Sequence, residues 1–105
     1  MHQPAEFRQV RERGQHLSDS YFSLSVLPNH EALPRLGLAI ATRTFGTAVA
    51  RNRIKRITRE SFRLNQHVIP PVDITVAARA AARGAPPQQL RASLHKFWMS
   101  IAKRW

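Results

Sequence analysis

Alternating apolar and polar positions predict three β-strands in the chain. Residues 20–27 place Phe22, Leu24 and Val26 on one face, and residues 35–42 and 72–79 repeat the pattern with their own aliphatic side chains. Turn-forming residues in "PNHEALP" separate the first two strands, so we expect these two to pair as a hairpin. The bulky side chains of all three strands would then line one face of a sheet.

Three other segments have the helical period. Residues 4–14 carry apolar side chains on one face and end at Gly14, a common helix terminator. Apolar positions recur at helical spacing from residue 48 to about residue 68, where "IPP" ends the pattern. The prolines of "RGAPP" suit the start of a last helix. Its apolar face would be formed by Leu90, Leu94, Phe97 and Ile101.

The order helix, strand, strand, helix, strand, helix predicts a mixed α/β (α+β) fold. A length of 105 residues with 43% hydrophobic content suits one domain spanning residues 1–105. The second face of the strands carries only small side chains, too small to build another core. Either this face stays open, so that a backbone or base can approach it closely, or the first helix covers it; both can hold in part. These small residues are Ser23, Ser25, Gly37, Ala39, Ala41, Thr75 and Ala77.

The segment "AVARNRIKRITRESFR", residues 48–63, holds six cations and a single acid, Glu60. On a helical wheel, an apolar stripe for docking on the sheet comprises Ala50, Ile54, Ile57, Ser61, Leu64 and Val68. The cations take the remaining surface: Arg51, Arg53, Lys55, Arg56, Arg59 and Arg63. Like charges four residues apart repel by roughly a few tenths of a kcal/mol per pair. Since solvated helix faces usually mix both signs, this face predicts contact with a polyanion.

Two side chains on the same helix have alternative interpretations. The Asn52 amide suits contact with a sugar or a base edge, although a surface asparagine is often merely tolerated. Phe62 lies near the Lys55 edge of the cationic arc, where packing is more common than base stacking.

Charge and composition narrow the classes of function. With 17 Lys plus Arg against 6 Asp plus Glu, the formal charge is +11, and nucleic acid or an acidic membrane is the expected partner. The absence of cysteine excludes disulfides and thiolate metal sites. No signal peptide or membrane span is evident, so we expect a cytoplasmic protein.

Several rival functions fit the sequence less well. A self-contained nuclease would need clustered carboxylates or histidines, whereas the five histidines and six acids are scattered, with Asp19 and Asp73 expected at a turn or a strand end. A DNA-binding helix-turn-helix needs two short helices, and a membrane-surface helix needs a broader apolar face. A ribosomal or general RNA-binding protein fits the composition alone.

The run "RNRIKR" followed by "RESFR" resembles the motif R-N-R-x-K-R and R-E-x-F-R of the bacterial ribonuclease P protein subunit family. The segments "EFRQVRERG", "RLGLAIATRTFG" and "VDITVAAR" stand where that family has its first helix, an R-x-G strand and the next strand. The resemblance implies a two-layer sandwich with a left-handed strand-helix-strand crossover, as in the ribosomal protein S5 domain 2-like fold. It also implies a protein that binds a catalytic RNA and helps it remove the 5′ leader of precursor tRNA, with the cleavage chemistry and its Mg²⁺ belonging to the RNA.

The resemblance also implies roles for individual residues. Positions that face the catalytic RNA are Arg51, Asn52, Arg53 and Arg56, and the row of cations extends this set to Lys55, Arg59 and Arg63. The single-stranded leader is held in a groove between the first helix and the open sheet face, at positions matched by Phe7, Phe22, Lys55 and Arg59. Arg11 stands where a second aromatic is common, and Thr42 with Arg43 replaces paired lysines. Leader binding is therefore expected to depend more on charge than on stacking.

Overall fold

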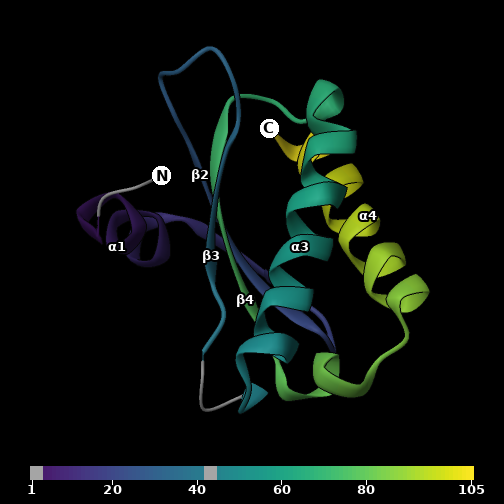
Figure 1. Cartoon of the computed structure of the whole chain (residues 1–105). Coiled ribbons are helices and arrows are strands. Elements are labelled where there is room, and N and C mark those ends of the chain that lie inside the picture. The colour runs from purple at the N-terminus through teal and green to yellow at the C-terminus, as the bar shows by residue number, and fades with distance from the viewer. Residues whose placement is uncertain (1–3, 42–44) are drawn as a thin grey trace.

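The computed structural model describes residues 4–41 and 45–105 (Figure 1). All six predicted elements are present within this part of the chain, and β1 is additional. The helices are α1 (Pro4–Arg13), α3 (Ala48–Asn65) and α4 (Pro87–Arg104), with short 3-10 helices η1 (Gln66–Val68) and η2 (Ala80–Gly84). The strands are β1 (Gln15–Ser18), β2 (Phe22–Pro28), β3 (Arg35–Ala39) and β4 (Val72–Ala78).

Within the described residues the strands form one sheet in the order β1-β2-β4-β3. The predicted hairpin of β2 and β3 is wrong, because β4 lies between them, antiparallel to β2 and parallel to β3. β4 pairs with β2 along its whole length, from Phe22 opposite Ala78 to Pro28 opposite Val72. This arrangement puts the two strands with fully buried side chains at the centre of the sheet. β3, whose Leu36 and Leu38 are only partly buried, takes an edge.

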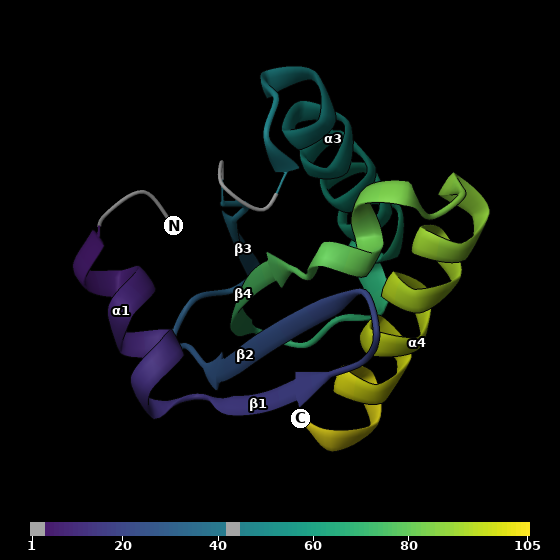
Figure 2. The same ribbon diagram turned by 90° about the horizontal axis from the view of Figure 1, so that it is seen from below.

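α3 connects the parallel strands β3 and β4. Figures 1 and 2 together show that this crossover is left-handed, as the family resemblance implied and against the general right-handed preference. α3 and α4 cover one face of the sheet, and α1 lies on the opposite side (Figure 1). The chain is thus an α+β sandwich in which the basic helix α3 forms the crossover connection between β3 and β4.

The core lies between the sheet and the pair α3 and α4. Leu24 and Val76 from the central strands are fully buried there with Ile54 of α3. Trp98 of α4 donates its indole N–H to Ser61 Oγ of α3 at 2.8 Å and contacts Phe62 edge-to-face, with ring centroids 5.7 Å apart. The expectation that Phe62 packs is therefore confirmed.

The buried face of α3 differs in part from the predicted stripe. Leu64 and Val68 are 63% and 40% exposed, whereas Thr58 and Phe62 are buried. The reason is that α4 packs beside α3 on the same layer, so the buried face of α3 turns from the sheet toward α4. A helical wheel indicates the stripe that docks on the sheet and carries no information on packing against α4.

α1 is attached to the opposite face mainly through its C-terminal half. Val10 is the one buried side chain among those of α1 that the structure describes. The turn into β1 is so tight that a Cβ on Gly14 would lie 2.4 Å from the Val10 carbonyl oxygen and 2.9 Å from that of Val26. Glycine is therefore required where α1 meets β1 and β2.

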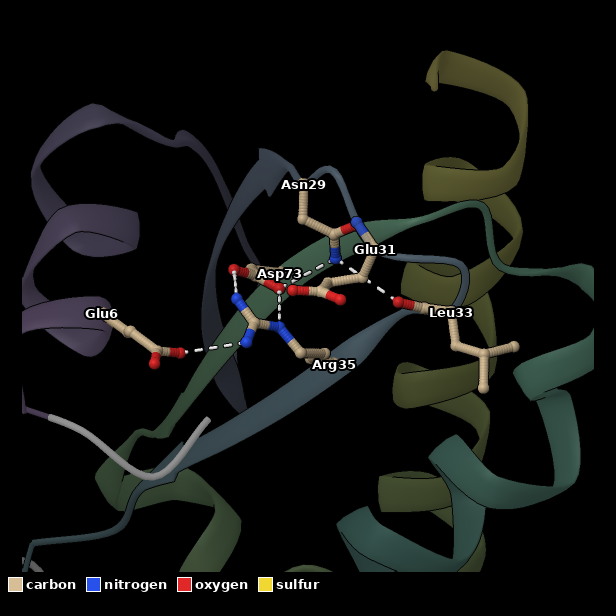
Figure 3. Close-up of polar contacts among 6 residues, drawn as sticks. All are labelled: Glu6, Asn29, Glu31, Leu33, Arg35 and Asp73. Atoms are coloured by element: carbon tan, nitrogen blue, oxygen red, sulfur yellow. Dashed lines mark hydrogen bonds and ion pairs between the residues drawn. The ribbon is translucent and has the colours of Figure 1, made fainter.

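A polar network ties the N-terminal half of α1 to the sheet (Figure 3). Arg35 of β3 donates from Nε and Nη2 to the two carboxylate oxygens of Asp73 of β4, at 2.7 and 2.6 Å. Asn29 Nδ2 donates to Asp73 Oδ1 at 2.9 Å, and Arg35 Nη1 lies 3.1 Å from Glu6 Oε2 of α1. Four segments of the chain meet at this network.

The network sets the protonation of its members. Burial raises the pKa of Asp73, but the hydrogen bonds from Arg35 and Asn29 outweigh burial, and the pKa of Asp73 lies below its usual value. The same hydrogen bond to Asp73 raises the pKa of Arg35 further above neutrality. Asp73 thus sits in a strand as an ion-pair partner, and Asp19 accepts from the N–H groups of Tyr21 and Phe22 in a turn, as expected for both.

We predict that Asp73→Asn lowers the free energy of unfolding at pH 7 by about 2–3 kcal/mol, because it leaves a partly buried guanidinium without its carboxylate. A native pKa below the unfolded value gives stability that is present above about pH 4 and is lost as the pH falls through the native pKa. Urea unfolding from pH 7 to pH 2 should therefore show a shallower acid limb in the variant. If the free energies of unfolding of the two proteins differed by the same amount at every pH, this assignment would be contradicted.

Candidate nucleic-acid interface

The cations of α3 lie on the side of the helix that faces away from the core. Thr47 caps the N-terminus of α3, and its Oγ1 accepts a hydrogen bond from the Ala50 N–H at 3.1 Å. Its buried residues fix the orientation of the helix, so that Asn52, Arg56, Arg59 and Arg63 are exposed and Arg51, Arg53 and Lys55 are half-buried. Glu60 is the only acid in the α3 sequence.

The first turn of α3 is positively charged. No acid occupies the first turn of α3, where Arg51 lies near the positive end of the helix dipole. The helix dipole thus adds to the positive charge of the side chains at this end of α3. A phosphate backbone against this end of α3 would be attracted by both the helix dipole and the cationic side chains.

A hollow of about 450 Å³, here called the edge hollow, runs along β3 between α1 and α3. It brings together three of the predicted groove residues, Phe7, Lys55 and Arg59. Leu36, Gly37, Leu38 and Phe62 complete its lining. Two cations beside an aromatic ring and an apolar floor suit a nucleotide, which presents phosphate charge and a flat base.

A second hollow of about 770 Å³, the sheet-face hollow, lies over the small-residue face. In the strand register Ser25 is opposite Thr75, which is opposite Gly37, and this row forms part of the face. α1 covers one end of the face with Val10, and Ser25, Gly37 and Thr75 are buried. The other small residues are half-buried or exposed beside the hollow, so both alternatives hold in part. The hollow is lined by Arg8, Arg11, Glu12, His16, Ser23, Ser25, Ala39, Ala41, Thr75, Val76 and Ala77.

Three polar or charged residues that line the sheet-face hollow were not predicted. Arg8 precedes Arg11 by three residues and so shares its helix face, a spacing that the sequence displays. Glu12 lies on the same helix. His16 belongs to β1, which the apolar pattern did not predict, and its Nδ1 is 2.9 Å from Ser25 Oγ.

The structure contradicts the groove role of Phe22. Its ring is fully buried in the core, because Phe22 stands on the bulky face of β2 with Leu24 and Val26. It therefore offers no surface on which a base can stack. Arg43 lies outside the described residues.

In residues 4–41 and 45–105, no three His, Asp or Glu side chains gather closely enough to hold a metal ion. None of the described helices is both long and apolar enough to cross a membrane.

Comparisons with known proteins agree with this arrangement. Residues 1–102 match the family model for Ribonuclease P. The chain is 43% identical to the ribonuclease P protein component of Methylococcus capsulatus over 101 residues, covering 96% of this chain and 79% of that protein. It is similar to the RNase P protein structure from Staphylococcus aureus, with a TM-score of 0.89, 31% identity and coverage of 98% and 94% of the two chains. The RNase P protein structure from Thermotoga maritima gives a TM-score of 0.83, 32% identity and coverage of 91% of each chain.

The fold and the cationic helix define a small basic α+β protein of a ribonucleoprotein. The chain belongs to the ribonuclease P protein family. Membership makes it a protein component of an endoribonuclease of tRNA processing, with RNA as its partner.

Proposed function

We propose that this chain binds the catalytic RNA of ribonuclease P through α3 and holds the 5′ leader of precursor tRNA beside α1. The single observation that carries the proposal is the edge hollow, where Lys55 and Arg59 of the basic helix meet Phe7 of α1. The same helix thus presents one group of cations to the hollow and another outward. Two RNAs are brought together by one element.

The outward group is proposed as the contact to the catalytic RNA. It comprises Arg51, Asn52, Arg53, Arg56 and Arg63, all at least partly exposed. Arginine suits this role because its planar guanidinium donates to two phosphate oxygens at once. Asn52 supplies an amide for a sugar or base edge.

The groove residues suit a leader whose sequence varies from one tRNA to the next. An aromatic ring stacks on any base, and cations bind phosphates whatever the sequence. The sheet-face hollow adds Arg8 and Arg11 to the positive charge around α1. We propose that the leader runs through both hollows, past Phe7 and Arg11.

We assign the cleavage chemistry to the RNA subunit. The donor set of the described protein does not fit a divalent cation, since Glu12, the carboxylate of the sheet-face hollow, shares that hollow with Arg8 and Arg11. Mg²⁺ is therefore proposed to be held by the RNA, and the protein to bind and position substrate. With precursor tRNA as substrate, we place the protein in the cytoplasm.

Reconstitution tests this function directly. We expect precursor tRNA to be cleaved at low magnesium only when the cognate catalytic RNA and the protein are mixed, because the protein supplies leader and phosphate contacts that the RNA lacks. Cleavage is measured with the RNA alone, the protein alone and the mixture. Cleavage by the protein alone would move the chemistry into this chain, and no stimulation would favour a ribosomal or general RNA-binding role.

The outward cations are tested by the salt dependence of binding. Arg51→Ala with Arg53→Ala should weaken association with the catalytic RNA and reduce the log–log salt slope by about 0.7 to 0.9 for each phosphate that is no longer neutralised. The matched control, Arg91→Ala with Lys96→Ala, removes the same charge from the exposed side of α4. If both pairs change the slope equally, binding follows net charge and the assignment to α3 fails.

Phe7 is tested by comparing two substrates. Phe7→Ala should weaken binding of precursor tRNA to the holoenzyme by about 1–3 kcal/mol, the worth of one stacked base, and leave mature tRNA binding unchanged. Leu33→Ala, which shortens an exposed apolar side chain in the loop before β3, serves as the control. Equal weakening for precursor and mature tRNA would show that Phe7 supports the fold rather than the leader.

A further inference from the structure

The N-terminal half of α1 carries a groove residue but has little apolar attachment. Phe7 lines the edge hollow, yet Val10, three residues later, is the one buried side chain among those described for α1. Gly14 fixes the other end of the helix, where its N–H donates to the Val10 carbonyl at 2.8 Å. The wall that bears Phe7 therefore needs a second point of attachment.

Glu6 provides that attachment. Its Oε2 lies 3.1 Å from Arg35 Nη1, immediately before Phe7 in the chain (Figure 3). The side chains of Glu6 and Arg35 are 35% and 32% exposed, although the Glu6 Oε2 atom that faces Arg35 is itself buried. Neither side chain belongs to the apolar core, so the pair can break without exposing that core.

Arg35 is already held in place when it meets Glu6. Asp73 binds its Nε and Nη2, which leaves Nη1 directed toward α1. An ordinary exposed ion pair contributes little because both long side chains must be ordered to form it. Here the guanidinium is ordered by the sheet, so only the Glu6 side chain loses freedom when the pair forms.

We propose that Glu6 is a positioning residue for leader binding, which holds the first turns of α1 on Arg35 and so keeps Phe7 in the wall of the edge hollow. This inference rests on the proposed function, because it concerns the same groove. It assigns to an acidic residue a supporting role in binding a polyanion. Simple electrostatics gives the opposite expectation, since removing an acid from a chain of charge +11 strengthens attraction to RNA.

The two expectations for removal of Glu6, weaker binding from lost positioning and stronger binding from simple electrostatics, provide the test. In the holoenzyme, Glu6→Ala should weaken precursor tRNA binding about 3- to 5-fold and leave mature tRNA binding unchanged. The matched control is Glu60→Ala, which makes the same change of charge at an exposed helical position on α3 and should bind precursor tRNA at least as tightly as the natural chain. Equal behaviour of the two variants would overturn the proposal.

A double variant shows whether Glu6 acts through Phe7. If it does, Glu6→Ala should weaken binding no further in a chain that already carries Phe7→Ala. Additive effects would mean that Glu6 acts on the leader by another route. If Phe7→Ala itself leaves precursor binding intact, the proposed function fails; if Phe7→Ala weakens binding and Glu6→Ala does not, only the positioning role fails.

Hydrogen exchange of the RNA-free protein gives a readout that does not depend on substrate. The amides of Arg8 to Val10 should exchange faster in Glu6→Ala than in the natural chain, because the first turns of α1 open more often. The amides of β4 should keep their protection, which shows that the sheet remains folded. Unchanged exchange in α1 would overturn the proposal.

Discussion

The division of large and small side chains between the two faces of the sheet is the constraint on which this structure depends. Phe22, Leu24 and Val26 of β2 share their face with the aliphatic residues of β4, and this single apolar face requires cover. α3 and α4 supply it together, so both lie on one side of the sheet. The opposite face has nothing bulky to bury, and α1 covers only part of it. Because successive side chains of a strand point to opposite faces, the strands that place large residues in the core place small residues around the sheet-face hollow.

Three of the acidic residues, Glu6, Asp19 and Asp73, support the fold, whereas α3 concentrates cations. Asp73 and Glu6 both bind Arg35, and Asp19 accepts hydrogen bonds from the backbone after β1 and from the Ser93 hydroxyl. The α3 sequence, by contrast, has Glu60 as its only acid. The excess positive charge is thus concentrated on the element that crosses between β3 and β4. A fold that placed its acids on α3 would be less self-repelling and would also bind RNA less strongly.

Local pattern predicted the elements well and their partners poorly. Alternation located β2, β3 and β4 and the wheel located the cations, because both depend on neighbours in the sequence. β1 has four residues and one aliphatic side chain, Leu17, which is too little for a periodic pattern. The insertion of β4 between β2 and β3 follows from pairing between segments far apart in the sequence, and so does the contact of Arg35 with Asp73. The alternation of Phe22 with Leu24 and Val26 indicates burial of Phe22, whereas the family resemblance implies a groove position for it.

Electrostatics acts in two distinct ways around the groove, and salt affects them differently. The phosphate contacts proposed for α3 would release counterions, so their contribution to the free energy of binding would fall linearly with the logarithm of the salt concentration. The pair of Glu6 and Arg35 is a contact within the protein, weakened by screening in proportion to its exposure. Asp73 is nearly buried, so it keeps Arg35 in place when the contact between Arg35 and Glu6 breaks. We therefore expect salt to loosen the first turns of α1 before it disturbs the sheet. The proposed leader binding should then depend on salt through both the leader phosphates and the turns of α1 that carry Phe7.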